Sequence, residues 1–309
     1  MTIQEFKNTA QNALTLSKTP VLDINVLLEH ALGFSKSELL LNYQKQIPNE
    51  KLLWLLDAIE KRKNGLPIAY ITGHKEFFGY DFVVTPQVLI PKPDTEILVE
   101  KAIKLILEKI DAKPDIQINI CDMCTGSGCI GISVLRHLKE NYKIKKLPRM
   151  TFADISEGAL DIAKQNAKTL LTDAFTNTNF ELKFIRTNLF ENVPYRYDVI
   201  LSNPPYIPHT MVDELLQDGR NEPRLALDGD VTLGGERACI DGQECDDGLT
   251  IIKNLIPQVY EHLNPHGVSF IETGEYNAKE TSAYAKEFGF KTSIHKDLEG
   301  TLRVVEMEK

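Results

Sequence analysis

The sequence predicts an α/β fold with a doubly wound, mostly parallel sheet, preceded by a small helical domain. After about residue 94, short apolar runs alternate with amphipathic helical segments, and repeated βα units of this kind build parallel sheets. The first ~70 residues show apolar residues at helical spacing and no convincing strand. A chain of 309 residues is also long enough to bury two hydrophobic cores.

The N-terminal segment is expected to form a bundle of short helices. One helix is indicated by apolar residues that share a face, namely Val21, Ile24, Leu27, Leu28 and Ala31. A strand hairpin over residues 76–84 and a proline-rich linker should follow. The predicted division is a helical domain over residues 1–75, a hairpin and linker over 76–93, and the α/β domain over 94–309.

The α/β domain is predicted element by element from its apolar runs and the turns between them. The expected strands cover residues 116–121, a segment ending at 154, 182–185, 197–201 and 268–271, and the expected helices cover 94–110, 130–138, 158–171, 249–263 and 278–288. The last two strands, 291–295 and 302–307, are joined too tightly for a parallel crossover and should form an antiparallel hairpin at a sheet edge. Residues 228–247, rich in glycine and acids, are interpreted as a mobile surface insertion.

Composition and charge argue against several classes of protein. No apolar run approaches 18 residues and the N-terminus lacks the apolar core of a secretory signal, so we expect a cytoplasmic protein without a membrane partner. A net charge of −9 disfavours duplex nucleic acid as the main partner, since phosphate binding calls for a basic face. Cys121 and Cys124 form a CxxC pair without a second pair at metal-ligand spacing. We therefore expect no metal site.

A glycine-bearing loop, residues 122–130, lies between an expected strand and helix. Glycine lets a ligand approach the main chain closely, and the free N–H groups of a helix N-terminus attract an anionic group. The loop fits a pyrophosphate site, the amino-acid end of a methyltransferase cofactor, or a tight turn that binds nothing. Asp154 ends the next strand, 26 residues beyond Gly128. There it can bind both hydroxyls of a ribose or, with Ser156, cap the following helix.

The sequence Asn203-Pro204-Pro205-Tyr206 follows another apolar strand, at the sheet edge where α/β proteins place their ligands. An amide or aromatic NH₂ group is a poor nucleophile because its lone pair is delocalised. The side-chain oxygen of Asn203 and the carbonyl of Pro204 can each accept one N–H of such a group and aim its nitrogen at a sulfonium methyl. Tyr206 can supply an aromatic wall. A proline-rich turn without a ligand is the less favoured interpretation.

These motifs resemble those of a known family. Asn-Pro-Pro-Tyr is similar to the acceptor motif of class I, seven-stranded amino-methyltransferases, and residues 89–96 resemble the "IPRPDTE" signature of the release factor glutamine methyltransferases (the PrmC/HemK family). Residues 65–73, 76–79 and 222–227 also resemble that family, so the likeness covers most of the chain. It implies a Rossmann-like methyltransferase domain behind a helical N-terminal domain. The implied reaction methylates the side-chain amide nitrogen (N5) of the glutamine in the Gly-Gly-Gln motif of class 1 peptide chain release factors, with S-adenosylmethionine as cofactor.

The resemblance also assigns roles to individual residues. Those implied to bind the cofactor are Cys124, Thr125, Gly126, Ser127 and Gly128 at the methionine part, Asp154 at the ribose, and Asn188 and Leu189 beside the adenine. Asn203 would touch both cofactor and substrate, with Pro204, Pro205 and Tyr206 completing the glutamine site, and Asn203, Pro204 and Tyr206 are implied to be catalytic. The chain departs from the pattern where Cys124 replaces a common glycine, Asn188 an acid, and Lys92 an arginine.

Three other functions compete with this one. A ribosomal-protein glutamine methyltransferase shares the chemistry, but residues 93–96 favour release factors. An N6-adenine nucleic-acid methyltransferase needs a basic channel and base flipping, which the negative charge disfavours. A noncatalytic NAD-binding module leaves the Asn203 motif without a role. Glu272, after the strand near 268–271, is interpreted as a cap for local backbone without a chemical role.

Overall fold

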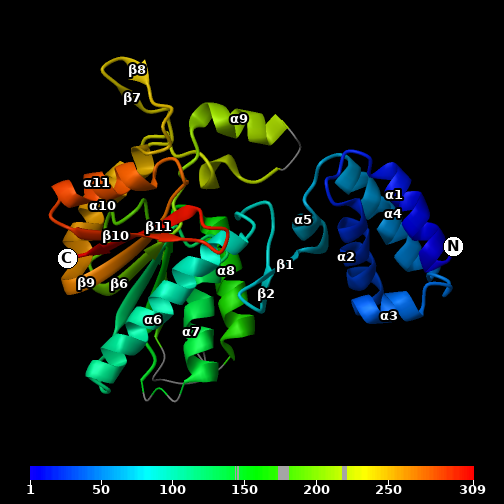
Figure 1. Ribbon diagram of the computed structural model, residues 1–309, viewed down its shortest axis with the longest axis horizontal. Helices are drawn as coiled ribbons and strands as arrows, with labels where there is room; N and C mark the ends of the chain where they lie inside the picture. The colour runs from blue at the N-terminus through cyan, green and yellow to red at the C-terminus, as the bar shows by residue number, and fades with distance from the viewer. Residues whose placement is uncertain (143, 145, 173–180, 218–220) are drawn as a thin grey trace. The chain divides into compact units, whose positions relative to one another are not determined.

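The computed structural model describes residues 1–142, 144, 146–172, 181–217 and 221–309. The chain forms two compact units, drawn in Figure 1. The smaller unit consists of Met1–His74 and Glu214–Asn221, and the larger unit of Lys75–Asp213 and Glu222–Lys309. Residues of the predicted linker thus belong to the larger unit. None of the described helices is long and apolar enough to cross a membrane.

The smaller unit is built from short helices, as predicted. They are α1 (Ile3–Ala13), α2 (Pro20–Leu32), α3 (Lys36–Leu41), α4 (Asn49–Lys63) and α5 (Ile68–Thr72). Thr2 and Ser35 begin α1 and α3 with capping boxes, in which side chain and backbone satisfy each other's hydrogen bonds. Gly33 ends α2 in the left-handed conformation that glycine tolerates best. Ile24, Leu27 and Leu28, from the predicted apolar face of α2, are fully buried in the core of this unit.

The larger unit opens with the predicted hairpin, β1 (His74–Phe77) and β2 (Tyr80–Val83). Among the described residues, seven strands form its main sheet, in the order β10-β11-β9-β6-β3-β4-β5. Their bounds are β3 (Asn119–Met123), β4 (Arg149–Asp154), β5 (Leu182–Arg186), β6 (Tyr197–Ser202), β9 (Leu263–Glu272), β10 (Lys291–Lys296) and β11 (Leu302–Glu308). β3, β4, β5, β6 and β9 run parallel, whereas β11 pairs antiparallel with both β9 and β10. The predicted doubly wound sheet and its closing antiparallel hairpin are confirmed.

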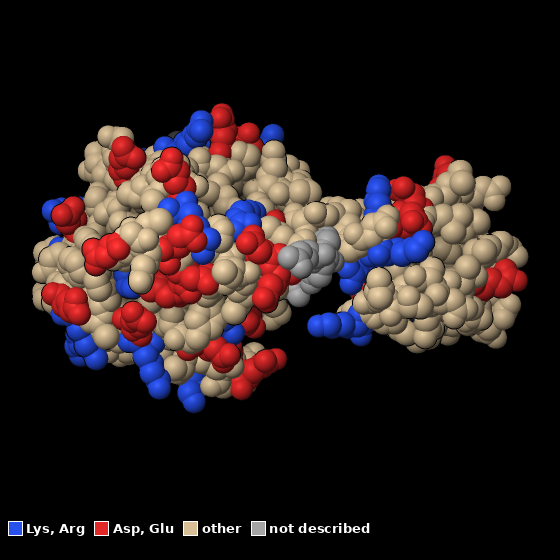
Figure 2. All heavy atoms as spheres, turned by 90° about the horizontal axis from the view of Figure 1, so that it is seen from above, with Lys and Arg blue, Asp and Glu red and all other residues tan. Residues whose placement is uncertain are grey.

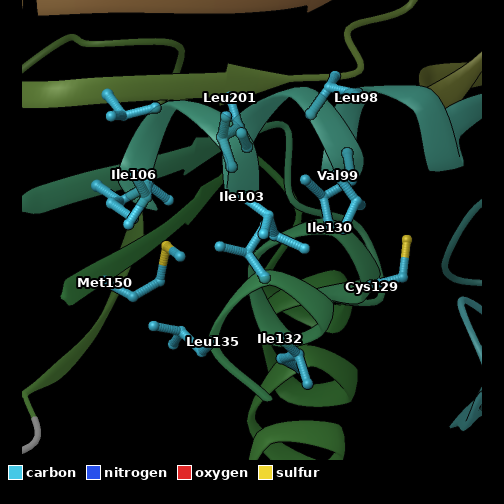
Figure 3. Close-up of a cluster of buried hydrophobic side chains, with 14 of the residues drawn as sticks. Leu98, Val99, Ile103, Ile106, Cys129, Ile130, Ile132, Leu135, Met150 and Leu201 are labelled. Carbon is cyan, nitrogen blue, oxygen red and sulfur yellow. The ribbon is translucent and has the colours of Figure 1, made fainter. Parts of the chain in front are cut away.

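Helices cover both faces of this sheet (Figure 1). On one side lie α6 (Glu96–Ala112), α7 (Cys129–Asn141) and α8 (Glu157–Leu170), and on the other α10 (Thr250–His262) and α11 (Ala278–Glu287). Figure 3 shows apolar side chains of α6 and α7 gathered with Met150 of β4 and Leu201 of β6. The other elements of the described residues are η1 (Pro93–Thr95), α9 (His209–Gln217), η3 (Arg224–Ala226), β7 (Cys239–Ile240) and β8 (Gln243–Glu244).

The sheet changes winding direction at β3, which lies between β4 and β6. The chain leaves β3 toward β4 on one side and later returns to β6 on the other, so the loops at the carboxyl ends diverge. Such a switch point opens the crevice in which α/β sheets bind ligands. The glycine loop follows β3, Asp154 ends β4 and Asn203 follows β6. The fold therefore brings the three predicted motifs to one edge.

The acidic, glycine-rich segment 228–247 differs from the prediction. Asp228 and Asp230 are buried, at 1% and 0% exposure. The Asp230 carboxylate accepts hydrogen bonds from the backbone N–H groups of Gly248 (2.8 Å) and His209 (3.3 Å). The β7–β8 hairpin is exposed. The expectation of a surface insertion is therefore wrong for the first residues of the segment, because buried backbone N–H groups need the acceptors that these aspartates supply.

Candidate active site

A cavity of about 340 Å³ lies in the larger unit at the carboxyl edge of the sheet. Its walls come from the loops after β3, β4 and β6, from residues 87–95 and from residues 223–235. The volume falls within the range of small-molecule sites, roughly 300–1,000 Å³. Of the predicted site residues, those that line it are Cys124, Thr125, Gly126, Ser127, Asp154, Asn188, Leu189, Asn203 and Pro205.

The glycine loop is held in place by a buried carboxylate behind it. Asp122 Oδ2 accepts hydrogen bonds from the Thr125 hydroxyl (2.7 Å) and from the Gly131 N–H (3.0 Å). Complete burial raises the pKa of Asp122 to about 7. Cys124 and Gly126 both have positive φ, 58° and 54°, a conformation that glycine adopts with less strain than other residues. The loop is thus fixed in a conformation that turns its backbone toward the cavity.

Asp154 faces the cavity with its carboxylate oriented by two backbone groups. Oδ2 accepts from the Gly126 N–H and Oδ1 from the Ser156 N–H, both at 2.9 Å. Burial raises the pKa of Asp154, and these hydrogen bonds oppose the shift. The residue that caps α8 is Ser156, whose hydroxyl accepts from the Ala159 N–H at 3.2 Å. A carboxylate can accept about four hydrogen bonds, so Asp154 retains acceptor capacity toward a ligand.

The part of the cavity next to the loop after β5 has apolar walls and one side-chain hydrogen bond between its lining segments. The Asn188 side-chain nitrogen donates to the Leu233 carbonyl at 2.8 Å, which ties the 228–247 segment to the loop after β5. Leu189 is buried with a positive φ of 50°. Apolar side chains that line the cavity include Ile155, Leu189, Leu225, Val231 and Leu233. This compartment suits a flat, apolar ring system with polar groups at its edge.

The Asn203 motif is anchored on both sides. The Asn203 side-chain nitrogen Nδ2 donates to the Thr95 hydroxyl at 3.2 Å. The Tyr206 hydroxyl donates to Glu272 Oε1 at 3.0 Å, and the Tyr206 carbonyl accepts from the hydroxyl of Tyr276 at 3.2 Å. Gly248 packs so closely on the motif that a Cβ there would lie 2.1 Å from the Tyr206 carbonyl oxygen. These contacts fix the motif at the cavity rim.

Three of the predicted site residues do not line the cavity in the described structure: Gly128, Pro204 and Tyr206. Gly128 is the first residue before α7 and has a φ of 78°, with a virtual Cβ 2.8 Å from Ile132 Cδ1. Its position serves the close packing of loop and helix. Pro204 and Tyr206 lie on either side of Pro205, which does line the cavity. The chemical roles of all these residues stay predictions.

An ion pair joins two of the family-like segments beside the cavity. Lys92 Nζ lies 2.7 Å from Glu222 Oε1, and the Glu222 carboxylate is almost fully buried. The Ile90 N–H also donates to Glu222 Oε1 at 3.4 Å. Lys92 therefore keeps the charge of the arginine it replaces and uses it to hold residues 89–96 against residues 222–227.

Sequence reasoning missed several residues of the site. Gln87, Val88 and Pro91 of the predicted linker line the cavity, and so do Val231 and Leu233 of the predicted surface insertion. For Val88, Pro91, Val231 and Leu233, apolar side chains in proline- and glycine-rich stretches were the available signal. Glu272, predicted only as a cap, is 1% exposed and bonded to Tyr206.

Comparisons with known proteins match two family models and several curated relatives. Residues 5–73 match the family model described as the PrmC N-terminal domain, and residues 96–231 match the methyltransferase small domain. A release factor glutamine methyltransferase of Koribacter versatilis is 33% identical over 99% of this chain and 98% of its own length, and one of Rhodopirellula baltica is 33% identical over 95% and 90%. A solved protein-(glutamine-N5) methyltransferase (release factor-specific) from Alicyclobacillus acidocaldarius is 24% identical over 74% of this chain and 99% of that one, with a TM-score of 0.36. The chain belongs to the release factor glutamine methyltransferase family.

Proposed function

We propose that this chain is the S-adenosylmethionine-dependent enzyme that methylates the N5 amide nitrogen of glutamine in the Gly-Gly-Gln motif of class 1 release factors. Relatives that align with most of its length are named release factor glutamine methyltransferases. The observation that carries the proposal is the Asn203 side chain, which lines the cavity and has its nitrogen bonded to Thr95. The opposite end of that amide is an oxygen, the acceptor that a substrate NH₂ group requires.

The residues around the cavity fit S-adenosylmethionine. Asp154 offers acceptor capacity for ribose hydroxyls, and the backbone of the loop over residues 124–128 borders the place for the methionine part. The apolar compartment near Leu189 suits the adenine, with Asn188 at its edge. When bound, the cofactor supplies an electrophilic methyl group on a sulfonium centre.

The contribution of the protein to the reaction is positioning. Asn203 Oδ1 and the Pro204 carbonyl would each accept one N–H of the glutamine side chain, so that its nitrogen lone pair points into the cavity. The amide nitrogen becomes acidic as the methyl group arrives, so no strong base is needed before attack. Orientation of this kind lowers the activation free energy by several kcal/mol, and by up to about 7–11 kcal/mol in favourable intramolecular reactions.

Substrate recognition is assigned to the helical N-terminal domain, residues 1–75. Its core is complete, yet it exposes large apolar side chains, among them Leu16, Leu40, Leu41 and Leu53. Exposed apolar groups on a folded unit suit binding of a partner protein. With release factors as partners, we also propose a cytoplasmic location.

Labelling tests the proposed reaction. The protein is incubated with methyl-labelled S-adenosylmethionine and a release factor, its Gln→Ala variant at Gly-Gly-Gln, or duplex DNA. We expect label on the unaltered factor alone. Equal label on the variant, or label on DNA, would overturn the glutamine assignment. On the face of the larger unit seen in Figure 2, acidic and basic side chains are interspersed.

A further inference from the structure

An asparagine in the interior of helix α8 is almost fully buried. Asn166 is 1% exposed. Asparagine is a poor helix former, and a buried amide without partners costs free energy, so this residue needs specific contacts. Its oxygen Oδ1 accepts from the Val83 N–H at 2.8 Å. Its nitrogen Nδ2 donates to the Val83 carbonyl at 3.0 Å and to the Ser127 carbonyl at 2.9 Å, so both amide protons are used.

The two bonds to Val83 fix the orientation of the Asn166 amide. A backbone N–H only donates and a backbone carbonyl only accepts, so Oδ1 must face the first group and Nδ2 the second. A reversed amide would set its NH₂ against the Val83 N–H and its oxygen against two carbonyls. Val83 ends β2, and its double bond with the side chain resembles a hydrogen-bonded pair of an antiparallel ladder. The second proton of Nδ2 is thereby directed at Ser127.

The chain after β2 runs along α8 toward the cavity. Gly158 is eight residues before Asn166 and on the same face of α8, and a Cβ there would lie 2.8 Å from Gln87 Cδ. The four residues from Val83 to Gln87 span about 13 Å when extended, and eight residues of helix span about 12 Å. The segment therefore follows the helix between these two contacts, and its continuation over residues 87–91 lines the cavity.

The glycine loop rests on the same helix. Ser127 lines the cavity and is 2% exposed, and its carbonyl takes part in a buried hydrogen bond with Asn166. A Cβ on the next residue, Gly128, would lie 3.2 Å from the Cβ of Ala163, about one turn before Asn166. A buried backbone carbonyl needs a donor, which Asn166 supplies. One amide group thus joins two walls of the cavity, the glycine loop and segment 83–91.

We propose that Asn166 is a positioning residue that holds the glycine loop and segment 83–91 at the spacing that S-adenosylmethionine requires. This role rests on the proposed function through its cofactor and not through its acceptor. Asn166 does not line the cavity, so it acts through the backbone of Ser127 and Val83. The acceptor motif at Asn203 follows a different strand, β6. Loss of the Asn166 amide should therefore weaken cofactor binding and spare methyl transfer once the cofactor is bound.

The variant Asn166→Ala separates these two effects. Its Kd for S-adenosylhomocysteine, measured by calorimetry below the unfolding temperature, should rise about tenfold, the effect of losing one net hydrogen bond. KM for S-adenosylmethionine should rise with it, while kcat at saturating cofactor stays within about threefold of wild type. The matched control is Asn264→Ala at the amino edge of the sheet, where Asn264 Nδ2 donates to Asp198 Oδ1 at 2.8 Å. It removes a side-chain hydrogen bond and should leave Kd and KM unchanged.

Hydrogen exchange tests the same link in the wild-type protein. Exchange of the Val83 N–H requires its bond to Asn166 to open, and the same side chain holds Ser127. Saturating S-adenosylhomocysteine should therefore slow exchange at Val83 by about tenfold or more, as followed by NMR. The Gly79 N–H, which donates to Glu76 Oε1 at 2.7 Å in the turn of the same hairpin, is the control and should change less than about twofold.

The outcomes distinguish the role of Asn166 from the proposed function. A wild-type protein that binds S-adenosylhomocysteine but does not label a release factor overturns the proposed acceptor alone. A folded Asn166→Ala variant with the wild-type Kd, or with a lowered kcat and an unchanged KM, overturns the role of Asn166 alone. If that variant does not fold, exchange decides, and equal slowing at Val83 and Gly79, or none at Val83, overturns the role.

Discussion

At the residue scale, the site depends on single atoms whose partners are fixed. The Asn203 amide has one end bonded to Thr95, and Asp154 has each oxygen bonded to one backbone N–H. Both side chains keep acceptor capacity toward the cavity because the protein uses only part of it. A ligand there meets groups that are already oriented, which lowers the entropic cost of reaching a reactive geometry.

Replacing Asn203 by alanine should remove the acceptor for the substrate amide. We expect kcat to fall by about 10²–10³-fold, the loss typical of one preorganised hydrogen-bonding group. Affinity for S-adenosylhomocysteine is the second readout. Asn141→Ala, at an exposed end of α7, should behave as wild type. An Asn203→Ala enzyme with normal kcat would remove Asn203 from the mechanism.

At the element scale, one glycine connects the 228–247 segment to the acceptor motif. Gly248 has a φ of +71°, and a Cβ there would lie 2.1 Å from the Tyr206 carbonyl oxygen. The turn between β7 and β8 has a comparable glycine, Gly242, with a φ of +79° and open space around its Cα. The two positions therefore share a positive φ, but Gly248 is buried and closely packed whereas Gly242 is exposed.

Gly248→Ala and Gly242→Ala test that difference. Each should lose roughly 1–2 kcal/mol of stability because an L-residue must adopt a left-handed conformation. Gly248→Ala should lose more, and its kcat should fall because the Tyr206 backbone has to move. Thermal unfolding and kcat of both variants provide the measurement. Equal behaviour of the two would show that the 228–247 segment does not position the motif.

The elements themselves could be predicted from the sequence because their signals are local. Apolar runs and glycine turns identified β3 to β6, and the short connection between residues 296 and 302 revealed the antiparallel hairpin of β10 and β11. The burial of Asp230 could not be predicted, since its donors, the N–H groups of Gly248 and His209, lie far away in sequence. The contacts of Glu272 could not be predicted for the same reason. Its environment comes from Thr95 and Tyr206, which only the folded sheet brings together.

At the scale of the whole molecule, buried acids link stability to pH. The pKa of Asp122 in the folded protein is about 7, against 3.8 for the free side chain. A raised folded-state pKa means that the folded state holds the proton more tightly. The resulting stabilisation is complete below about pH 4 and is lost as pH rises toward 7. Glu272 shifts in the same direction.

Asp122→Asn should remove this dependence at one site. Relative to wild type, the free energy of unfolding of the variant should increase between pH 4 and pH 7, by at most about 4 kcal/mol. Urea unfolding at several pH values measures the difference. If the free energy of unfolding of the variant and that of wild type differ by a constant amount across this range, Asp122 is ionised throughout. Other interactions then offset the cost of burying its charge.

Recognition of a whole release factor should depend on the smaller unit. Leu40 and Leu41 of α3 are 71% and 82% exposed. The double variant Leu40→Ser, Leu41→Ser should raise KM for the release factor about tenfold, since each leucine buried in a complex contributes roughly 1.5–3 kcal/mol at most. KM for a short Gly-Gly-Gln peptide should not change. Leu298→Ser, at 92% exposure in the larger unit, is the control, and an equal effect of both would argue against a specific surface.

The walls of the cavity come from segments that are distant in sequence, residues 87–95 and 223–235, and the Asn188 side chain joins the latter to the loop after β5 by a hydrogen bond to the Leu233 carbonyl at 2.8 Å. A ligand that fills the cavity therefore adds contacts between parts of the chain that lie far apart in sequence. At a hundred times its dissociation constant, S-adenosylhomocysteine should add about 2.7 kcal/mol to the stability of the folded protein. Trypsin cleavage after Arg237 should slow in parallel, so that cofactor supply sets the resistance of the enzyme to proteolysis.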